Sequence, residues 1–302
     1  MGDIFNLALL QNTIRTATPL VLAALGGLLT MHAGILNIGM EGMILIGAFF
    51  AVLGSYLFQS ALMGVVFGVV AGIIMGLLFG VFVIELKSDE FIIGIAINIF
   101  AGGLTVFLLR SIFGVKGAFS SPDIMPLPDV SLPFLDKVEF LDTIFNNHSI
   151  FVYISWILII LVYVFLYKTP YGYWLRGVGE HEEALETAGI KPKKVKYFAS
   201  IMCGAFCGVA GAHLSLGYLT LFTENMSAGK GFISLAAIIF GASNPVKVYG
   251  ASLLFGFFDA LGIRMQTLGI PSQFTAMIPY LATVVVLYIV AKKKLWQKRK
   301  VS

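Results

Sequence analysis

Residues 168–196 read KTPYGYWLRGVGEHEEALETAGIKPKKVK, a polar and charge-dense stretch in an otherwise apolar chain. Its six basic residues place it on the cytoplasmic side of a membrane by the positive-inside rule. Within it, residues 180–188 hold neither proline nor glycine and are flanked by Gly179 and Gly189. This pattern predicts a short surface helix between two glycine breaks. On the residues alone, the segment is either a solvated connection between two spans or a surface that docks a partner.

The rest of the chain has the composition of a membrane protein. Hydrophobic residues make up 58% and charged residues 12%, and the mean hydropathy is +0.93, which excludes a soluble globular domain. We expect an all-α polytopic protein with about nine or ten spans, each of ~20 apolar residues. The expected runs are 16–31, 40–58, 61–84, 91–109, 149–167, 197–217, 231–242, 248–268 and 273–291. The run 231–242 is short, which predicts an irregular crossing. No removable signal peptide is recognised, so the first spans are expected to direct insertion themselves.

The charges of the loops predict one orientation. The basic tail at 292–300 is expected in the cytoplasm with residues 168–196, because an even number of spans separates them. Counting back places residues 110–148 outside, where acidic residues outnumber basic ones and four prolines rule out a long helix. The chain is thus expected to be a single membrane domain, 1–302, with an external loop at 110–148 and a cytoplasmic loop at 168–196. Its N-terminus lies outside unless residues 3–15 form an extra span.

A second motif, GILNIGMEGMILIG at residues 34–47, places Asn37 and Glu41 in apolar sequence. A charge at the centre of a membrane helix costs about 2.5–3.5 kcal/mol on insertion scales, so both side chains should face protein or water. Gly39 and Gly42 weaken the helix and permit a break whose backbone groups line a cavity. The alternative is a loop that places Glu41 near the lipid headgroups.

Two polar residues in later apolar runs, Asn98 and Asp259, join these as candidates for the translocation path or the broken helix. Asp259 is the one acid deep in the later spans. Arg264 is five residues away, which is not a same-face spacing on a helix. The alternative for Asp259 is a structural, hydrogen-bonded acid near the outer surface.

A glycine ladder with four-residue spacing runs along the expected span 61–84. Such spacing lets two helix backbones approach closely, and packing within one subunit is favoured over a dimer interface. The ladder comprises Gly64, Gly68, Gly72, Gly76 and Gly80.

Two sequence motifs typical of enzymes do not occur in the chain. No GxxxxGK[ST] occurs, so an ATP site of that type is not expected, and no HExxH occurs. Cys203 and Cys207 share a helix face but have no His or acid nearby in sequence, so they are expected to be buried apolar residues and not a metal site. The net charge of +4 comes from residues beside membrane spans, which disfavours nucleic-acid binding.

Three regions resemble the permeases of ABC importers for branched-chain amino acids, simple sugars and nucleosides. The loop is similar to TPxGxxxRAVGENPxAAxxAGI, with Gly177 in place of the usual Ala and His181-Glu182 in place of Asn-Pro. Residues 37–42 match NIGxEG. Residues 210–262 resemble FTENMxAGxGFIALAAVIFGxxNP and LLFGxxDAL, which are closer to nucleoside importers than to ribose importers. The loop residues at matching places are Thr169, Pro170, Gly172, Arg176, Val178, Gly179, Glu180, Ala184, Ala188, Gly189 and Ile190.

The resemblance implies the fold of a type II ABC importer permease in a bacterial cell membrane, taking up nucleosides by alternating access. A permease of the same fold for simple sugars is the alternative. An ion-coupled secondary transporter is less favoured, because it typically carries an internal repeat with paired broken helices and none is found. In this family the short cytoplasmic helix docks on the ATPase. The coupling residues implied here are Arg176, Gly179, Glu180, Ala184, Leu185, Ala188 and Gly189.

The resemblance also implies partners. A tandem ATPase subunit would bind ATP and Mg²⁺, whereas this chain would hold no cofactor. A second homologous permease, more often a different chain than a copy of this one, and an extracellular substrate-binding lipoprotein complete the expected complex. Lipid surrounds it, and nucleic acid has no role.

Overall fold

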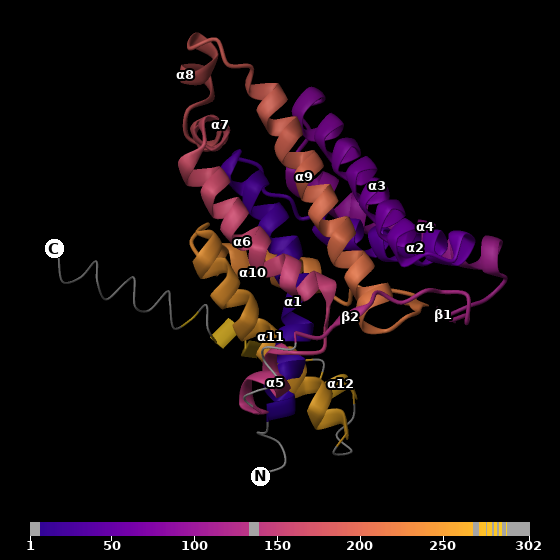
Figure 1. Cartoon of the computed structure of the whole chain (residues 1–302). Helices are drawn as coiled ribbons and strands as arrows, with labels where there is room; N and C mark the ends of the chain where they lie inside the picture. The colour runs from indigo at the N-terminus through magenta and orange to yellow at the C-terminus, as the bar shows by residue number, and fades with distance from the viewer. Residues whose placement is uncertain are drawn as a thin grey trace.

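The computed structural model describes residues 7–132, 139–267, 272–275, 277–279, 281–282, 284–285 and 288. Over these residues the chain is almost wholly helical (Figure 1). Seven helices are long and apolar enough to cross a membrane, which confirms the expected all-α polytopic fold. They are α1 (Leu7–His32), α2 (Met40–Phe58), α3 (Ala61–Gly80) with its π-helical extension η1 (Val81–Glu85), α4 (Glu90–Phe113), α6 (Ile150–Lys168), α9 (Pro192–Ala212) with its extension η2 (His213–Tyr218), and α11 (Pro245–Thr267).

Two of the nine expected runs are not among these seven helices. The run 231–242 corresponds to α10 (Lys230–Phe240), whose 11 residues are too few to cross hydrocarbon alone. The run 273–291 is described only in short pieces, the first of which is α12 (Ser272–Thr275), and the basic tail lies outside the described residues. Asn244 caps the start of α11 by accepting the backbone N–H groups of Val246 and Lys247.

Helix α1 shows whether residues 3–15 form a membrane span of their own. Residues 7–15 continue into the run 16–31 as one helix, so the described part of that segment forms no span of its own. The other end of α1 reaches Gly34, close to Gly179 of α7 (Pro170–Glu180). The start of α1 therefore lies at the opposite end of the molecule from α7 and α8 (Glu182–Thr187) (Figure 1).

Helices α2, α3 and α9 form a glycine seam, defined by the ladder on α3 and the glycines it meets. A Cβ added to Gly72 would overlap the carbonyl oxygen of Gly204, and one at Gly68 would lie 2.8 Å from the carbonyl oxygen of Gly47. Gly64 meets α2 in the same way, whereas Gly76 and Gly80 meet α9. The ladder thus packs within one subunit, the arrangement that the sequence favoured.

The outer faces of several helices remain apolar. Leu62 of α3 and Ile160 of α6 are 71% and 65% exposed, and an aqueous surface would not favour such side chains. Such faces are suited to contact with lipid acyl chains or with another membrane subunit.

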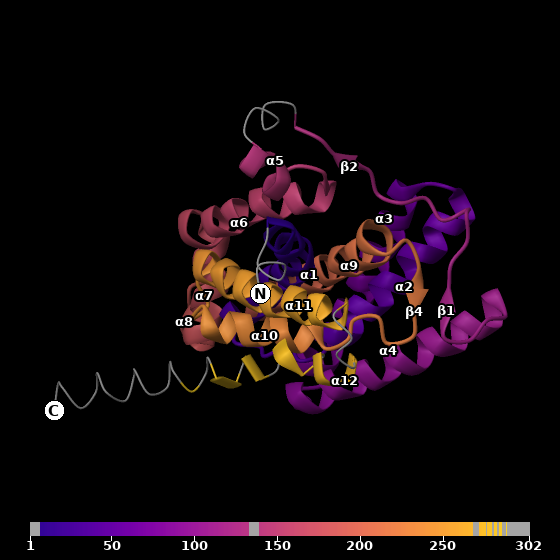
Figure 2. The same ribbon diagram turned by 90° about the horizontal axis from the view of Figure 1, so that it is seen from below.

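The end of the molecule away from α7 carries short strands. β1 (Ala118–Phe119) pairs with β4 (Phe222–Thr223), and β2 (Asp129–Val130) pairs with β3 (His148–Ser149), all antiparallel. The helix α5 (Glu139–Phe145) lies in the same region (Figure 2). The non-helical segment begins after Phe113 and not at Arg110 as expected, because α4 continues until Gly114, whose φ of +68° ends it.

Candidate functional site

The site is built around the break between α1 and α2. Helix α1 ends at His32 and α2 begins at Met40, so α2 starts inside the protein. Glu41, in the first turn of α2, is 8% exposed. Its two carboxylate oxygens accept the backbone N–H groups of Gly229 and Gly231, each at 2.6 Å. These are the backbone donors that a carboxylate in this apolar run requires.

Glu41 therefore lies at the start of two helices at once. Gly229 precedes α10 with a φ of +82°, a backbone conformation that suits glycine. A Cβ on Gly231 would lie 2.9 Å from the Glu41 carboxylate, so a side chain there would disrupt the contact. The N-termini of α2 and α10 each carry partial positive charge, which stabilises a carboxylate between them.

Asn98 and Asn37 hold the break with hydrogen bonds to backbone. The Asn98 side chain accepts the N–H of Gly42 at 2.8 Å and donates to the carbonyl of Ile38 at 3.1 Å. The Asn37 side chain accepts the N–H of Gly39 at 2.9 Å. Both amides are thereby committed to the shape of the broken helix.

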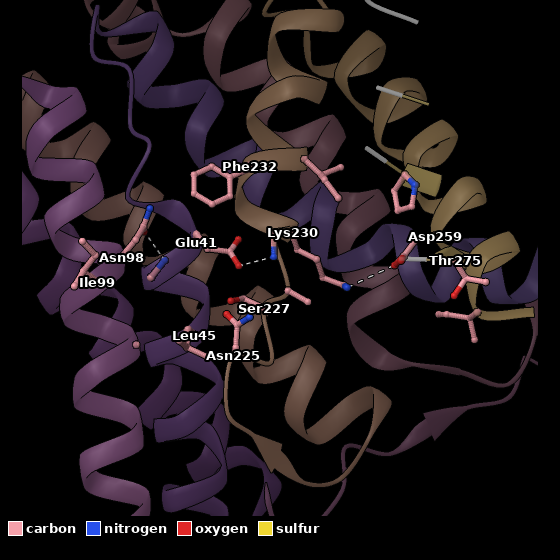
Figure 3. A pocket seen from close by; sticks show the side chains of 18 of the residues that line it. Glu41, Leu45, Asn98, Ile99, Asn225, Ser227, Lys230, Phe232, Asp259 and Thr275 are labelled. Atoms are coloured by element: carbon pink, nitrogen blue, oxygen red, sulfur yellow. Dashed lines mark hydrogen bonds and ion pairs between the residues drawn. The ribbon is translucent and has the colours of Figure 1, made fainter. Parts of the chain in front are cut away.

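A cavity of about 670 Å³ opens beside Glu41, between α2, α4, α10 and α11 (Figure 3). Leu45, Ile99, Phe232 and Ile263 contribute apolar walls. The polar groups of the cavity come mainly from the turn before α10 and from α11. Beside Glu41 and Asn98, they are Asn225, Ser227, Lys230, Asp259, Gln266 and Thr275.

Two of these polar groups differ in their pairing. Ser227 is 1% exposed, and its hydroxyl has no hydrogen-bond partner. The ammonium of Lys230 lies 3.5 Å from a carboxylate oxygen of Asp259, with side chains 16% and 22% exposed. That distance marks an ion pair without the close contact of a charge-assisted hydrogen bond.

The structure brings together most of the candidates that the sequence singled out. Glu41, Gly42, Asn98 and Asp259 line one cavity, whereas Asn37 and Gly39 lie behind it in the break. The partner of Asp259 is Lys230 from another motif. Sequence reasoning assigned no individual role to Asn225, Ser227, Lys230 or Phe232. The available signal was their place in the segment FTENMSAGKGF, which leads into the short apolar run 231–242.

The cytoplasmic loop folds into two helices and not the single helix expected at 180–188. Helix α7 ends at Glu180, and α8 spans Glu182–Thr187. Gly179 is a helical residue and not a break, because its missing Cβ allows contact with the carbonyl of His32. The break falls instead at His181, whose N–H caps α7 by donating to Gly177. Gly189, with a φ of +82°, does form a turn.

The implied coupling residues divide into two groups. Leu185 packs against Gly177 of α7, whereas Ala184 and Ala188 are exposed. The guanidinium of Arg176 lies 4.9 Å from the ring centres of both Tyr167 and Tyr173. Cation–π attraction stabilises this position of the side chain. Arg176 therefore links α7 to the end of α6.

Comparison with known proteins gives the family. Residues 9–289 match the family described as the branched-chain amino acid transport system permease component. The chain belongs to this family. It is a permease, a multi-pass protein of the cell membrane, and not itself an enzyme.

The permease is similar along most of its length to curated relatives. It is 34% identical to the guanosine ABC transporter permease protein NupQ of Bacillus subtilis, over 91% of this chain and 89% of the relative. It is 32% identical to the nucleoside ABC transporter permease protein NupC of Lactococcus lactis, over 96% and 94%. A putative glucose ABC transporter permease of Haloferax volcanii is 31% identical, over 88% and 80%. No solved structure matches the chain significantly.

Proposed function

We propose that this permease carries nucleosides into the cell by alternating access, through the cavity beside Glu41. A nucleoside is an uncharged solute with a flat base and a hydroxylated sugar. Phe232 offers an aromatic face, and Asn225 and Ser227 offer hydrogen bonds. Stacking of a base on an aromatic side chain contributes about 1–3 kcal/mol in nucleic-acid-binding proteins. The cavity, together with the names of two relatives as guanosine and nucleoside permeases, supports this substrate class.

Simple sugars are the second candidate. The observation in their favour is the similarity to a putative glucose permease. A sugar has hydroxyl groups for Asn225 and Ser227 but no flat base for Phe232. A sugar ring can pack on Phe232 only through its C–H groups, so the flat base of a nucleoside suits this side chain better.

We infer that transport is driven by an ATPase subunit that docks at α8 and binds ATP and Mg²⁺. The exposed Ala184 and Ala188 supply a small apolar surface for docking. Lys196 of α9 pairs with Glu182 of α8. Movement of α8 is thereby passed to the start of α9, and α9 packs on α2 and α3 through the glycine seam. Because α2 carries Glu41, a docking event can change the cavity.

We also infer that the second permease of the complex is a different chain. Two permeases of Bacillus subtilis match this chain, at 34% and 24% identity. Two of Lactococcus lactis match it, at 32% and 25%. Such pairs in one organism favour a heterodimer. An extracellular binding lipoprotein would deliver the solute to the end that carries β1 and β4.

Uptake into proteoliposomes tests the proposal. The chain is purified together with an ATPase subunit, a second permease and a binding protein from the same organism. We expect uptake of radiolabelled guanosine that requires ATP and is reduced by excess unlabelled nucleoside but not by excess glucose. Competition by glucose alone would overturn the nucleoside assignment, and uptake without ATP would overturn the ATPase partnership.

A further inference from the structure

The cavity contains two features that attract anions. One is the N-terminus of α10, where backbone N–H groups point outward. The other is the ammonium of Lys230, the first residue of α10. The hydroxyl of Ser227, buried and without a partner, lies in the same turn (Figure 3). A helix N-terminus, a lysine and a serine hydroxyl are the donors that bind phosphate groups in many proteins.

Each of these features is matched by a carboxylate. Glu41 occupies the helix N-terminus, because its oxygens take the N–H groups of Gly229 and Gly231. Asp259 of α11 faces the ammonium of Lys230 at 3.5 Å. Among the cavity-lining residues that the structure describes, these three are the ionisable ones, so their summed charge is −1 when all are ionised. A site built for an anion would not carry this balance.

We propose that Asp259 is a specificity-determining residue that makes the cavity accept uncharged solutes and reject their phosphate esters. It does so by neutralising Lys230, which leaves the ammonium unable to capture a phosphate. Glu41 also excludes anions, but it is tied to the broken helix and its removal changes the fold of the site. Asp259 joins Lys230 from a separate helix, so its charge can be changed with less disturbance. This inference rests on the proposed function for the choice of nucleosides as probes.

The test measures binding to the detergent-purified permease–ATPase complex without the binding protein, so that selection by the binding protein does not contribute. Radiolabelled guanosine and guanosine 5′-monophosphate are titrated by scintillation proximity. In the wild type we expect guanosine to bind and the monophosphate to bind at least about tenfold more weakly. In Asp259→Asn we expect the affinity for the monophosphate to rise by about tenfold, because the ammonium of Lys230 is no longer neutralised.

Two further variants separate charge from shape. The double variant Lys230→Met with Asp259→Asn removes the ammonium as well, so the gain in monophosphate binding should disappear. Asp123→Asn, in the exposed segment before β2, is the matched control and should behave as wild type. An equal gain in the double variant, or no gain in Asp259→Asn when guanosine still binds, overturns the inference.

If Asp259→Asn does not assemble, a variant that removes the other charge of the ion pair provides the test. Lys230→Met leaves Asp259 without its cation, so a cationic probe, 5′-amino-5′-deoxyguanosine, should bind about tenfold more tightly than it binds the wild type. Unchanged binding of that probe contradicts the inference. If the wild type binds no guanosine, the nucleoside assignment fails, and the same comparison with glucose and glucose 6-phosphate tests the charge filter independently.

Discussion

Helix α2 is held in two different ways along its length. At the glycine seam it touches α3 and α9 through backbone atoms, with almost no space between them. At its N-terminus it is held by polar side chains, with Glu41 reaching α10 and Asn98 reaching back from α4. Close packing tolerates no added atom, whereas hydrogen bonds can be exchanged for others of similar geometry. The seam therefore serves as the fixed part of the helix, and the junction at Glu41 as the part that can change.

The largest effect is expected from breaking the seam. Gly72→Leu places a side chain where the carbonyl of Gly204 lies, so α3 and α9 cannot approach and little protein should be recovered from detergent. Gly103→Leu, on α4 with nothing within 4 Å of its Cβ position, is the matched control. Recovery and melting temperature in detergent are measured for both. Equal recovery of the two variants would show that the seam is not the fixed part.

The next effect comes from the junction. Glu41→Leu leaves the N–H groups of Gly229 and Gly231 without an acceptor, at a cost of roughly 1–3 kcal/mol each if they stay buried. Glu41→Gln keeps the shape and one acceptor oxygen. We expect guanosine uptake to be lost in the leucine variant and largely kept in the glutamine variant. Equal uptake in both removes the junction from the mechanism, and loss in both with normal assembly indicates that transport needs the charge.

The coupling surface should affect activity without affecting the fold. Charged residues at both Leu185 and Ala188 should abolish uptake, but Leu185 also packs on Gly177, so its replacement detaches α8 as well. Ala188→Glu alone is the cleaner test, because this side chain is exposed. It should lower ATP-driven uptake at least severalfold while the protein remains in the membrane, since docking interfaces exclude charge from their centres. Ala242→Glu, exposed in the turn between α10 and α11, is the control, and co-purification of the ATPase is the second readout. Full uptake with Ala188→Glu would argue against docking at α8.

The smallest effect is expected from the ion pair between Lys196 and Glu182. Both side chains are partly solvated, and such pairs contribute little to stability. Lys196→Met should change the melting temperature by no more than about 2 °C. If α8 transmits movement through this pair, uptake should nevertheless fall by more than the stability does. Unchanged uptake would indicate that movement of α8 is transmitted through the packing of Leu185 and not through this ion pair.

The fold and the position of the site could be predicted from different kinds of signal. Hydropathy gave the seven long spans, because an apolar run of sufficient length is itself the physical requirement for crossing. The ladder from Gly64 to Gly80 indicated close packing but not the partner, since spacing carries no information about which helix is met. Glu41 could be recognised as a group that needs donors, whereas Gly229 and Gly231 could not be identified as those donors from their local sequence.

The coupling loop shows the limit of reading glycine as a break. Gly179 and Gly189 look alike in sequence, yet Gly189 has a positive φ and Gly179 is helical. The difference lies in tertiary contact, because Gly179 packs against the backbone carbonyl of His32 and leaves no room for a side chain. Likewise, the pairing of Lys230 with Asp259 depends on how α10 and α11 lie together, which no local pattern encodes.

The hydrogen bond from Gly229 to Glu41 joins residues 188 positions apart, which has a consequence for synthesis. At about 5–20 residues per second, the ribosome needs roughly 10–40 s after making Glu41 before its partner exists. During that time α2 has left the ribosome with a carboxyl group that the finished protein buries. The nascent helix must wait with this group hydrated or held at the translocon until its donors are made. The broken helix is therefore completed late in biogenesis, and shortening the chain before Gly229 would leave α2 without its anchor.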